Sequence, residues 1–465
     1  MASHNPLKIF ETTRVAPFPN SPHSATHLSL PLTFFDTSWL KFPPVERLFF
    51  YQLTHLTSLH FNSVILPKLK HSLSLALLHY LPLAGKLTWL PHASKPIISY
   101  SADDAVSLIV AETDADFNRL SSGDVLESSE LRHLIPELFS SDERASSMTL
   151  QITLFPNQGF CIGITTHHAV MDGRVATTFM KSWAYLCTQL DKQDPSLLSE
   201  LTPSFDRTDI EDPAGLYMVY LKNWAEYTGS DISEVNQLSL KVLGDLGVNR
   251  NSLRATFKLT REDIKKLKEK ILSKLEEVKP TKELQLSTFV VSYAYVLVCL
   301  VKAKAREGIR NVKFLFPVDY RNRLNPPLPS NYFGNCVFPR QAIVKASAFL
   351  EENGVAIIAE KVSNMIREID EKGLFEGAEK SLEKLMTGEP GEQTIGLAGS
   401  IRFNVHGVDF GWGRPKKVEI VSIDRTGAIA MGESGDGNGV EIGVVLSGHE
   451  MEIFSSFFVS GLQNL

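Results

Sequence analysis

The chain has 465 residues, of which 43% are hydrophobic and 22% charged. This length predicts two or three domains with a sizeable apolar core, because one domain usually takes about 100–200 residues. The 47 Lys and Arg against 53 Asp and Glu give a net charge of −6, without the basic excess of nucleic-acid-binding proteins, so we expect no nucleic-acid partner.

Cysteine usage and apolar runs favour a cytoplasmic protein that does not enter a membrane. The first twenty residues contain no apolar block of signal-peptide length. The longest apolar run, residues 289–301, stops at Lys302, short of the roughly 20 residues that span a bilayer, and predicts a buried helix. The four cysteines form no CxxC pair and fit a reducing compartment; they are Cys161, Cys187, Cys299 and Cys336.

The N-terminal part predicts strands that alternate with helices. Residues 47–51 predict the first buried strand, and Pro67 opens a helix that ends before Pro82. Residues 148–155 alternate apolar and polar side chains and form a predicted hairpin with residues 160–166 through an Asn-Gln-Gly turn. Further predicted elements are strands over 97–100 and 106–111 and a helix from Val175 to about Leu190.

Periodicity weakens between residues 191 and 248, which we interpret as a linker. A second domain then begins with a strand over 254–259 and a charged helix capped by Thr260. Later predicted elements are strands over 312–317, 337–339, 417–423, 427–431 and 440–446 and helices over 346–372 and 451–462. The predicted class is mixed α/β, with domains at 1–200 and 251–465 and a crossover at 201–250.

The string HHAVMDG, residues 167–173, lies where a predicted strand ends and a helix begins. Side chains at such a junction reach a cleft while rigid elements hold them from behind. A histidine there suits general-base catalysis, since its ordinary pKa near 6.5 leaves a neutral form at physiological pH.

Three interpretations of this string are open from spacing alone. His167 and His168 are two satisfied polar groups, or two metal ligands together with Asp172, or one base beside one packing residue. Adjacent histidines on an extended segment point to opposite faces, which disfavours one shared metal ion, and we predict no metal site.

Two later strings are less suggestive of chemistry. In DFGWG, two glycines flank a tryptophan and no residue is an obvious nucleophile, so Asp409, Phe410, Gly411, Trp412 and Gly413 predict a structural loop. Upstream, Arg321 is a candidate ion-pair partner for a buried carboxylate, and the string YFGNC follows at 332–336.

Taken together, PLTFFD at 31–36, LPLAGKL at 81–87, HHAVMDG, YFGNC and DFGWG resemble the BAHD family of plant CoA-dependent acyltransferases. YFGNC resembles the subgroup that acylates anthocyanin and flavonoid glucosides, many of whose members use malonyl-CoA. The resemblance implies two similar domains of the chloramphenicol-acetyltransferase type with a channel between them, and a monomer.

The resemblance also implies residue roles. His168 matches the catalytic base, which takes a proton from an acceptor hydroxyl as that oxygen attacks the thioester. Asp172 matches a structural residue that pairs with Arg321. The DFGWG loop supports the channel. The tract at 399–404 lacks the tryptophan that hydroxycinnamoyl members often place near Ser400, which leaves Ser400 as a substitute candidate for substrate binding.

CoA and a malonyl group need partners of their own. Ser287 and Thr288 begin the apolar helix and are candidates for binding the pantetheine or phosphate end of CoA. Lys258 is a candidate for binding a CoA phosphate. Arg174 directly follows the catalytic turn and is the candidate cation for a malonyl carboxylate.

The resulting hypothesis is a malonyl transfer from malonyl-CoA, as cosubstrate, to the 6-hydroxyl of a flavonoid, isoflavonoid or other phenolic glucoside. A hydroxycinnamoyl-CoA donor is the nearest alternative. A protein that binds CoA or phenolics without catalysis and a metal-dependent hydrolase are the alternatives from other classes.

Overall fold

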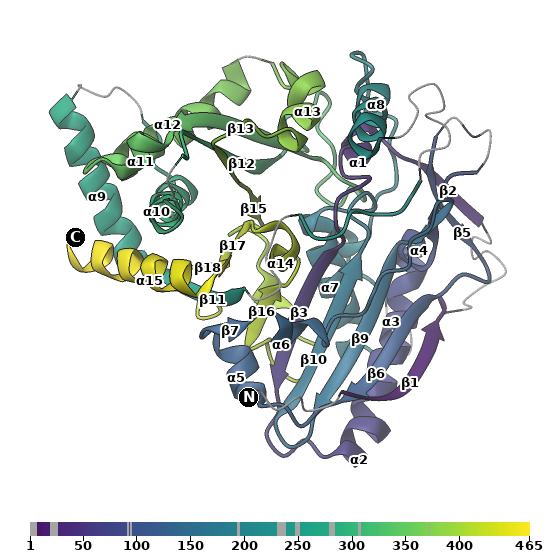
Figure 1. The fold of residues 1–465 in the computed structure, drawn as a ribbon. Coiled ribbons are helices and arrows are strands. Elements are labelled where there is room, and N and C mark those ends of the chain that lie inside the picture. The colour runs from purple at the N-terminus through teal and green to yellow at the C-terminus, as the bar shows by residue number, and fades with distance from the viewer. Residues whose placement is uncertain are drawn as a thin grey trace.

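The computed structural model describes residues 7–18, 27–90, 93, 95–192, 196–229, 239–246, 252–278, 284–305, 308–371 and 373–465. Mixed sheets and helices alternate through these residues, which confirms the predicted α/β class. Figure 1 shows the N-terminal strands, in purple and blue, beside a second body built from the green and yellow C-terminal elements.

A six-stranded sheet forms the centre of the N-terminal part. Its strand order is β1-β6-β9-β10-β3-β16. The bounds are β1 (Lys8–Val15), β6 (Val106–Glu112), β9 (Met148–Phe155), β10 (Gly159–Thr166), β3 (Val45–Gln52) and β16 (Lys417–Ile420). Helices α3 (Leu66–His79) and α7 (Gly173–Thr188) pack against each other over one face.

The predicted hairpin of β9 and β10 is confirmed, with all eight residue pairs in antiparallel register. Its turn requires glycine at position 159, where a Cβ atom would lie 2.1 Å from the carbonyl oxygen of Tyr51. The alternation of β9 nevertheless does not mark a solvent-exposed face, because every residue of the strand is buried. Its polar side chains bond to the covering loop instead: Gln151 Nε2 donates to the His133 carbonyl at 2.8 Å, and Thr149 Oγ1 donates to the Glu137 carbonyl at 3.1 Å.

Two sheets lie in the C-terminal part, one of five strands in the order β15-β17-β18-β11-β7 and one of three in the order β13-β12-β14. The strands of the first are β15 (Leu397–Ala398), β17 (Ile429–Glu433), β18 (Gly439–Leu446), β11 (Leu253–Thr260) and β7 (Leu126–Glu127). Those of the second are β13 (Val337–Lys345), β12 (Asn311–Asp319) and β14 (Glu392–Ile395).

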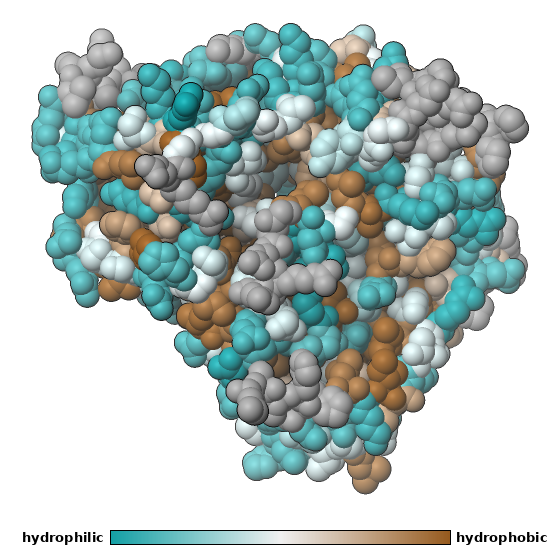
Figure 2. Space-filling view, in the orientation of Figure 1, coloured by the Kyte–Doolittle hydropathy of each residue, from teal (hydrophilic) through white to brown (hydrophobic). Residues whose placement is uncertain are grey.

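Long helices cover these C-terminal sheets. They are α9 (Arg261–Val278), α10 (Thr288–Ala303), α12 (Gly354–Glu371) and α15 (Gly448–Gln463). Helix α10 contacts α9, α12 and α15, and it is the buried helix that the apolar run predicted. In the described residues, no helix combines the length and the apolarity that crossing a bilayer requires. On the face shown in Figure 2, hydrophobic residues form separate patches between hydrophilic ones.

Each part of the chain contributes one strand to the other part. Strand β16 pairs with β3, so that Ile420 lies opposite Arg47, and β7 pairs with β11 in the C-terminal sheet. Buried ion pairs accompany this exchange: Glu46 on β3 binds Arg425 at 2.8 Å and Arg132 at 2.9 Å. The division at 1–200 and 251–465 therefore stays a proposal about folding units, since neither range forms its main sheet alone.

The expected linker contains a helix that the sequence pattern did not indicate. Helix α8 (Leu216–Thr228) lies within 201–250 and packs on α1 (Phe34–Thr37). Its Trp224 is fully buried and donates to the Thr37 carbonyl at 3.0 Å. Residues 193–195, 230–238 and 247–251 lie outside the described residues.

Several predicted bounds differ from the structure, among them the strand over 337–339, which continues to Lys345 as β13. The helix predicted over 346–372 is two helices, α11 (Ala346–Leu350) and α12, and Lys372 lies outside the described residues. The strand predicted over 417–423 ends at Ile420 and is followed by α14 (Ile423–Thr426). The strand predicted over 427–431 is observed at 429–433, as β17. It begins later because Gly427, with φ of 65°, ends α14 in the left-handed region.

The remaining elements are short. A four-stranded sheet has the order β2-β5-β4-β8, with β2 (His27–Pro31), β5 (Ile97–Ser101), β4 (Lys86–Thr88) and β8 (Arg144–Ser146). The short helical segments are α2 (Ser58–His60), Phe61–Ile65, α4 (Leu81–Ala84), α5 (Phe117–Ser122), α6 (Ser129–Arg132), Ser199–Leu201, Ala378–Lys380, α13 (Ser381–Met386) and Val405–Gly407.

Candidate active site

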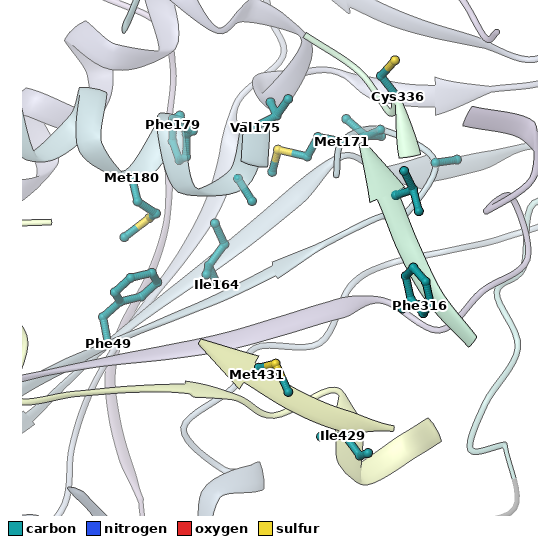
Figure 3. Packing of buried hydrophobic residues seen from close by; sticks show 14 of the residues in the cluster. Phe49, Ile164, Met171, Val175, Phe179, Met180, Phe316, Cys336, Ile429 and Met431 are labelled. Atoms are coloured by element: carbon teal, nitrogen blue, oxygen red, sulfur yellow. The ribbon is translucent and has the colours of Figure 1, made fainter. Parts of the chain in front are cut away.

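The HHAVMDG string forms the turn between β10 and α7, as predicted. Asp172 is the N-cap of α7, and its Oδ1 accepts hydrogen bonds from the backbone N–H groups of Arg174 and Val175, both at 3.1 Å. Figure 3 shows that the core around this turn comes from both parts of the chain, with Met171 and Val175 in the same cluster as Phe316 and Met431. The turn is therefore fixed on both sides by packed elements.

The two histidines have different surroundings. His167 is fully buried, and its Nδ1 accepts a hydrogen bond from the Ala169 N–H at 3.2 Å, which closes the turn. His168 is half-buried, and its ring stacks on Trp39 with 4.2 Å between ring centroids and 6° between planes. Its Nδ1 is buried, so Nε2 is the nitrogen left to meet a substrate.

Burial keeps both imidazoles neutral. It lowers the pKa of His168 to about 4, against smaller upward effects of its own carbonyl and of Asp172. It lowers the pKa of His167 to about 3, with a further downward effect of the charge on His168. A neutral His168 at physiological pH has the lone pair that a general base needs.

Asp172 is the centre of a buried charge network. Its Oδ2 lies 2.8 Å from Nη2 of Arg321, the partner that we expected from the sequence, and accepts the Cys336 N–H at 3.2 Å. Arg321 is fully buried and also contacts Asp319 at 3.2 Å. The network thus fixes the start of α7 to the end of β12.

Arg174 extends this network. Its Nη1 lies 2.8 Å from Asp319 Oδ2, and its side chain is 38% exposed. Asp319 is therefore a protein partner of Arg174, and the binding of a malonyl carboxylate by Arg174 stays a prediction. Its remaining N–H groups leave it able to bind an anion as well.

Two residues at this site were not predicted as site residues, Trp39 and Asn335. The Asn335 amide donates to the His168 carbonyl at 3.0 Å and to the Asp36 carboxylate at 3.1 Å. Asp36 belongs to PLTFFD and Asn335 to YFGNC, so residues of these two strings are hydrogen-bonded to each other and to the HHAVMDG turn. The occurrence of PLTFFD and YFGNC in the same sequence as HHAVMDG was a signal of this contact. No spacing rule, however, predicts that the three strings meet.

The other candidate residues lie in different settings. Ser400 lines an open cavity next to the start of α7, together with Phe403 and Met431. Ser287 is the exposed N-cap of α10, where its hydroxyl accepts the Val290 N–H at 3.3 Å.

The remaining two CoA candidates are also on the surface. Thr288 is exposed in the first turn of α10. Lys258 on β11 forms an ion pair with Asp436 at 2.5 Å, so an anion at Lys258 would compete with that carboxylate.

The DFGWG loop closes on itself. Asp409 Oδ1 accepts the N–H groups of Gly411 and Gly413 at 2.8 and 3.0 Å, and both glycines have φ near +100°. Phe410 is buried edge-on against Trp183 at 5.0 Å, and Trp412 lies edge-on to Phe160 at 6.1 Å. These contacts fit the structural role that we expected.

Among the described residues, no cluster of His, Cys, Asp and Glu has an arrangement that would hold a metal ion. The four cysteines are buried and free, so none is joined to another. Burial raises the pKa of the Cys161 thiol to about 12, which leaves it unreactive at physiological pH.

Comparisons with known proteins agree with this site. The model of the Transferase family matches residues 6–459. The chain is 45% identical over 467 residues to phenolic glucoside malonyltransferase 1 of Arabidopsis thaliana, with 98% of each chain covered. It is 43% identical to malonyl-CoA:anthocyanidin 5-O-glucoside-6''-O-malonyltransferase of the same species, with 95% of this chain and 96% of that one covered.

A solved structure, that of vinorine synthase, has the same fold at 20% identity, with a TM-score of 0.70 and 98% of both chains covered. The family model and these relatives together define the chain as a transferase. The chain belongs to the Transferase family, the BAHD acyltransferases, which confirms the resemblance of its motifs.

Proposed function

We propose that the protein transfers a malonyl group from malonyl-CoA to the 6-hydroxyl of the sugar in a phenolic glucoside, flavonoid and isoflavonoid glucosides included. The observation that carries the proposal is the neutral imidazole of His168, stacked on Trp39 with Nε2 as its reactive nitrogen. The two relatives, both named as glucoside malonyltransferases, support the donor and the acceptor class.

In the proposed reaction His168 Nε2 takes the proton of the sugar hydroxyl while that oxygen attacks the thioester carbonyl of malonyl-CoA. The tetrahedral intermediate collapses, the carbon–sulfur bond breaks, and the imidazolium returns its proton to the CoA thiolate. The low pKa of His168 favours this second transfer, because a buried imidazolium gives up its proton readily.

Arg174 is the proposed ligand of the donor's carboxylate. Asp319 binds Nη1 and orients the guanidinium, and the other N–H groups of Arg174 remain for a bidentate contact. Arg174 lies in the first turn of α7, two residues after Asp172, so the contact would place the acyl group beside the catalytic turn.

Ser287, Thr288 and Lys258 are the proposed contacts for CoA. Ser287 and Thr288 lie at the N-terminus of α10, where backbone N–H groups and the helix dipole favour an anion. The further proposals are a monomer in the cytoplasm, a compartment that the four free cysteines suit.

The test is product analysis by mass spectrometry, with malonyl-CoA and p-coumaroyl-CoA offered together and a panel of phenolic glucosides as acceptors. We expect malonylated glucoside as the main product and a loss of about 10²–10⁴-fold in rate for His168→Ala. His79→Ala is the matched control, because His79 is a half-buried histidine at the end of α3, and it should keep the wild-type rate.

Two results would contradict the proposal. If coumaroylated glucoside were the sole product, the donor would be a hydroxycinnamoyl-CoA and not malonyl-CoA. If His168→Ala transferred malonyl at the wild-type rate, His168 would not be the general base.

A further inference from the structure

A buried carboxylate, that of Asp36, lies next to the catalytic turn and takes no part in the proposed reaction. Asp36 is the third residue of α1, and it is fully buried together with Asn335, the residue to which it is hydrogen-bonded. A carboxylate is costly to bury unless other groups bind both of its oxygens. The contacts of the two oxygens therefore show what Asp36 holds in place.

The first oxygen of Asp36 binds Asn335. Oδ1 accepts the backbone N–H of Asn335 at 2.9 Å and its side-chain amide at 3.1 Å. The same amide nitrogen donates to the His168 carbonyl at 3.0 Å. Both partners only accept hydrogen bonds, so the NH₂ group of the amide, which has two donor hydrogens, must face them. Asn335 thus joins Asp36 to the backbone of His168.

The second oxygen of Asp36 fixes α1. Oδ2 accepts the Thr33 N–H at 2.9 Å and completes a capping box at the start of this helix. The chain then turns into Trp39, whose backbone N–H donates to the Asp36 carbonyl at 3.1 Å. The ring of Trp39 is the one that stacks on the His168 imidazole. Asp36 therefore also holds the segment that covers the ring of His168.

Arg207 supplies the counter-charge of this arrangement. Its Nη1 lies 2.9 Å from Asp36 Oδ2, and its side chain is only 10% exposed. Buried ion pairs are often no more stabilising than apolar residues of the same size, so stability alone is a weak reason for this pair. The pair does keep a carboxylate fixed at a place that water does not reach.

The orientation of His168 depends on two attachments. The backbone of His168 sets where the side chain starts, and the surface against which the ring packs sets how the ring is turned. Asn335 holds the first and Trp39 the second, and both are bound to Asp36. A general base must meet its proton within hydrogen-bond distance, and a displacement of about 1 Å can cost about 100-fold in rate.

We propose that Asn335 is a positioning residue, which together with Asp36 and Trp39 holds His168 in the orientation that presents Nε2 to the acceptor hydroxyl. The proposal rests on the proposed function, because it requires His168 to be the general base. It gives the asparagine of YFGNC a part in the chemical step, whichever acyl donor is bound.

The test is steady-state kinetics of Asn335→Ala with malonyl-CoA and a phenolic glucoside, with circular dichroism to establish that the variant is folded. We expect kcat to fall by about 10- to 100-fold while the KM of each substrate stays within about threefold. Asn331→Ala is the matched control, because the Asn331 amide donates to the Thr202 carbonyl at 2.6 Å, outside the catalytic turn. This control should keep the wild-type kcat.

A double variant separates positioning from a general structural defect. In a His168→Ala background, Asn335→Ala should leave the residual rate within about twofold, because no imidazole remains to be positioned. A general defect would lower that residual rate by the same factor as in the unaltered enzyme. If Asn335→Ala does not fold, Asn335→Ser replaces it, since serine keeps one donor hydrogen, and its kcat should also fall.

Three results would overturn the positioning role. They are a wild-type kcat in a folded Asn335 variant, an equal fall of kcat in Asn331→Ala, and a full further fall of the residual rate in the double variant. If the unaltered enzyme transfers malonyl to no glucoside, the proposed donor and acceptor fail instead. The same comparison with the acyl donor that the enzyme does use then decides the role of Asn335.

Discussion

The HHAVMDG turn and the DFGWG loop are built alike and serve different ends. In each, one aspartate oxygen accepts two backbone N–H groups: those of Arg174 and Val175 for Asp172, and those of Gly411 and Gly413 for Asp409. Only Asp172 uses its second oxygen to bind a fully buried arginine. Of the two motifs, HHAVMDG alone carries a half-buried imidazole, that of His168.

The difference teaches that the environment of a motif, rather than its hydrogen-bond pattern, decides whether it can perform chemistry. In DFGWG, the aspartate oxygen binds the loop's own backbone and the rings of Phe410 and Trp412 pack on other aromatic rings. HHAVMDG places neutral His168 beside charged Arg174 and Asp172. Matched substitutions in the two motifs test this difference.

The largest expected effect concerns the two aspartates. Asp172→Ala leaves Arg321 buried with one carboxylate partner fewer, and we expect it to lower the free energy of unfolding by about 3–5 kcal/mol. Asp409→Ala removes two solvent-exposed hydrogen bonds between backbone N–H groups and a carboxylate, and should cost only about 1 kcal/mol. Urea unfolding of both variants measures the two changes, and equal losses would refute a special structural role for the buried pair.

The second effect concerns the arginines that follow each motif. Arg174→Ala should lower kcat/KM for malonyl-CoA about tenfold more than that for acetyl-CoA, because only malonyl-CoA carries the carboxylate. Arg414→Ala is the control, since Arg414 is exposed after DFGWG, and it should leave the ratio of the two donors unchanged. If Arg174→Ala affects both donors equally, Arg174 does not recognise the carboxylate.

The smallest effect concerns the two tryptophans. Trp39 covers one face of the His168 ring, so Trp39→Leu should hydrate the ring and raise its pKa above 4 toward the ordinary 6.5. The acid limb of kcat/KM then moves to higher pH. Trp412→Leu should leave that limb in place, because Trp412 packs on Phe160. An unmoved limb in Trp39→Leu would show that stacking does not set the basicity of His168.

Local pattern predicted the elements around the site better than the contacts within it. The β9–β10 hairpin and α7 follow from periodicity and capping residues close in sequence. Helix α8 was missed because its buried face is largely aromatic, with Tyr217, Tyr220 and Trp224, and these residues are held by contacts distant in sequence more than by helix propensity.

In the site too, local pattern indicates residues that are close in sequence and misses contacts between distant ones. His168 and Asp172 are four residues apart and visible as a pattern, and the family resemblance supplied Arg321. Trp39 reaches His168 across 129 positions of sequence, and no spacing rule gives such a contact. The exchange of β7 and β16 is likewise a long-range pairing, which propensity does not encode.

The rate of malonyl transfer to a phenolic glucoside as a function of pH tests the role of His168 most directly. A protonated base is inactive, so activity is lost as the pH falls through the pKa of His168, and we predict a plateau from about pH 8 to about pH 5 with the loss near pH 4. Both buried histidines favour the fold while neutral, so stability also declines below about pH 6.5, and circular dichroism at each pH separates unfolding from titration. An acid limb at pH 6.5 in the folded enzyme would contradict a buried, neutral His168 as the general base.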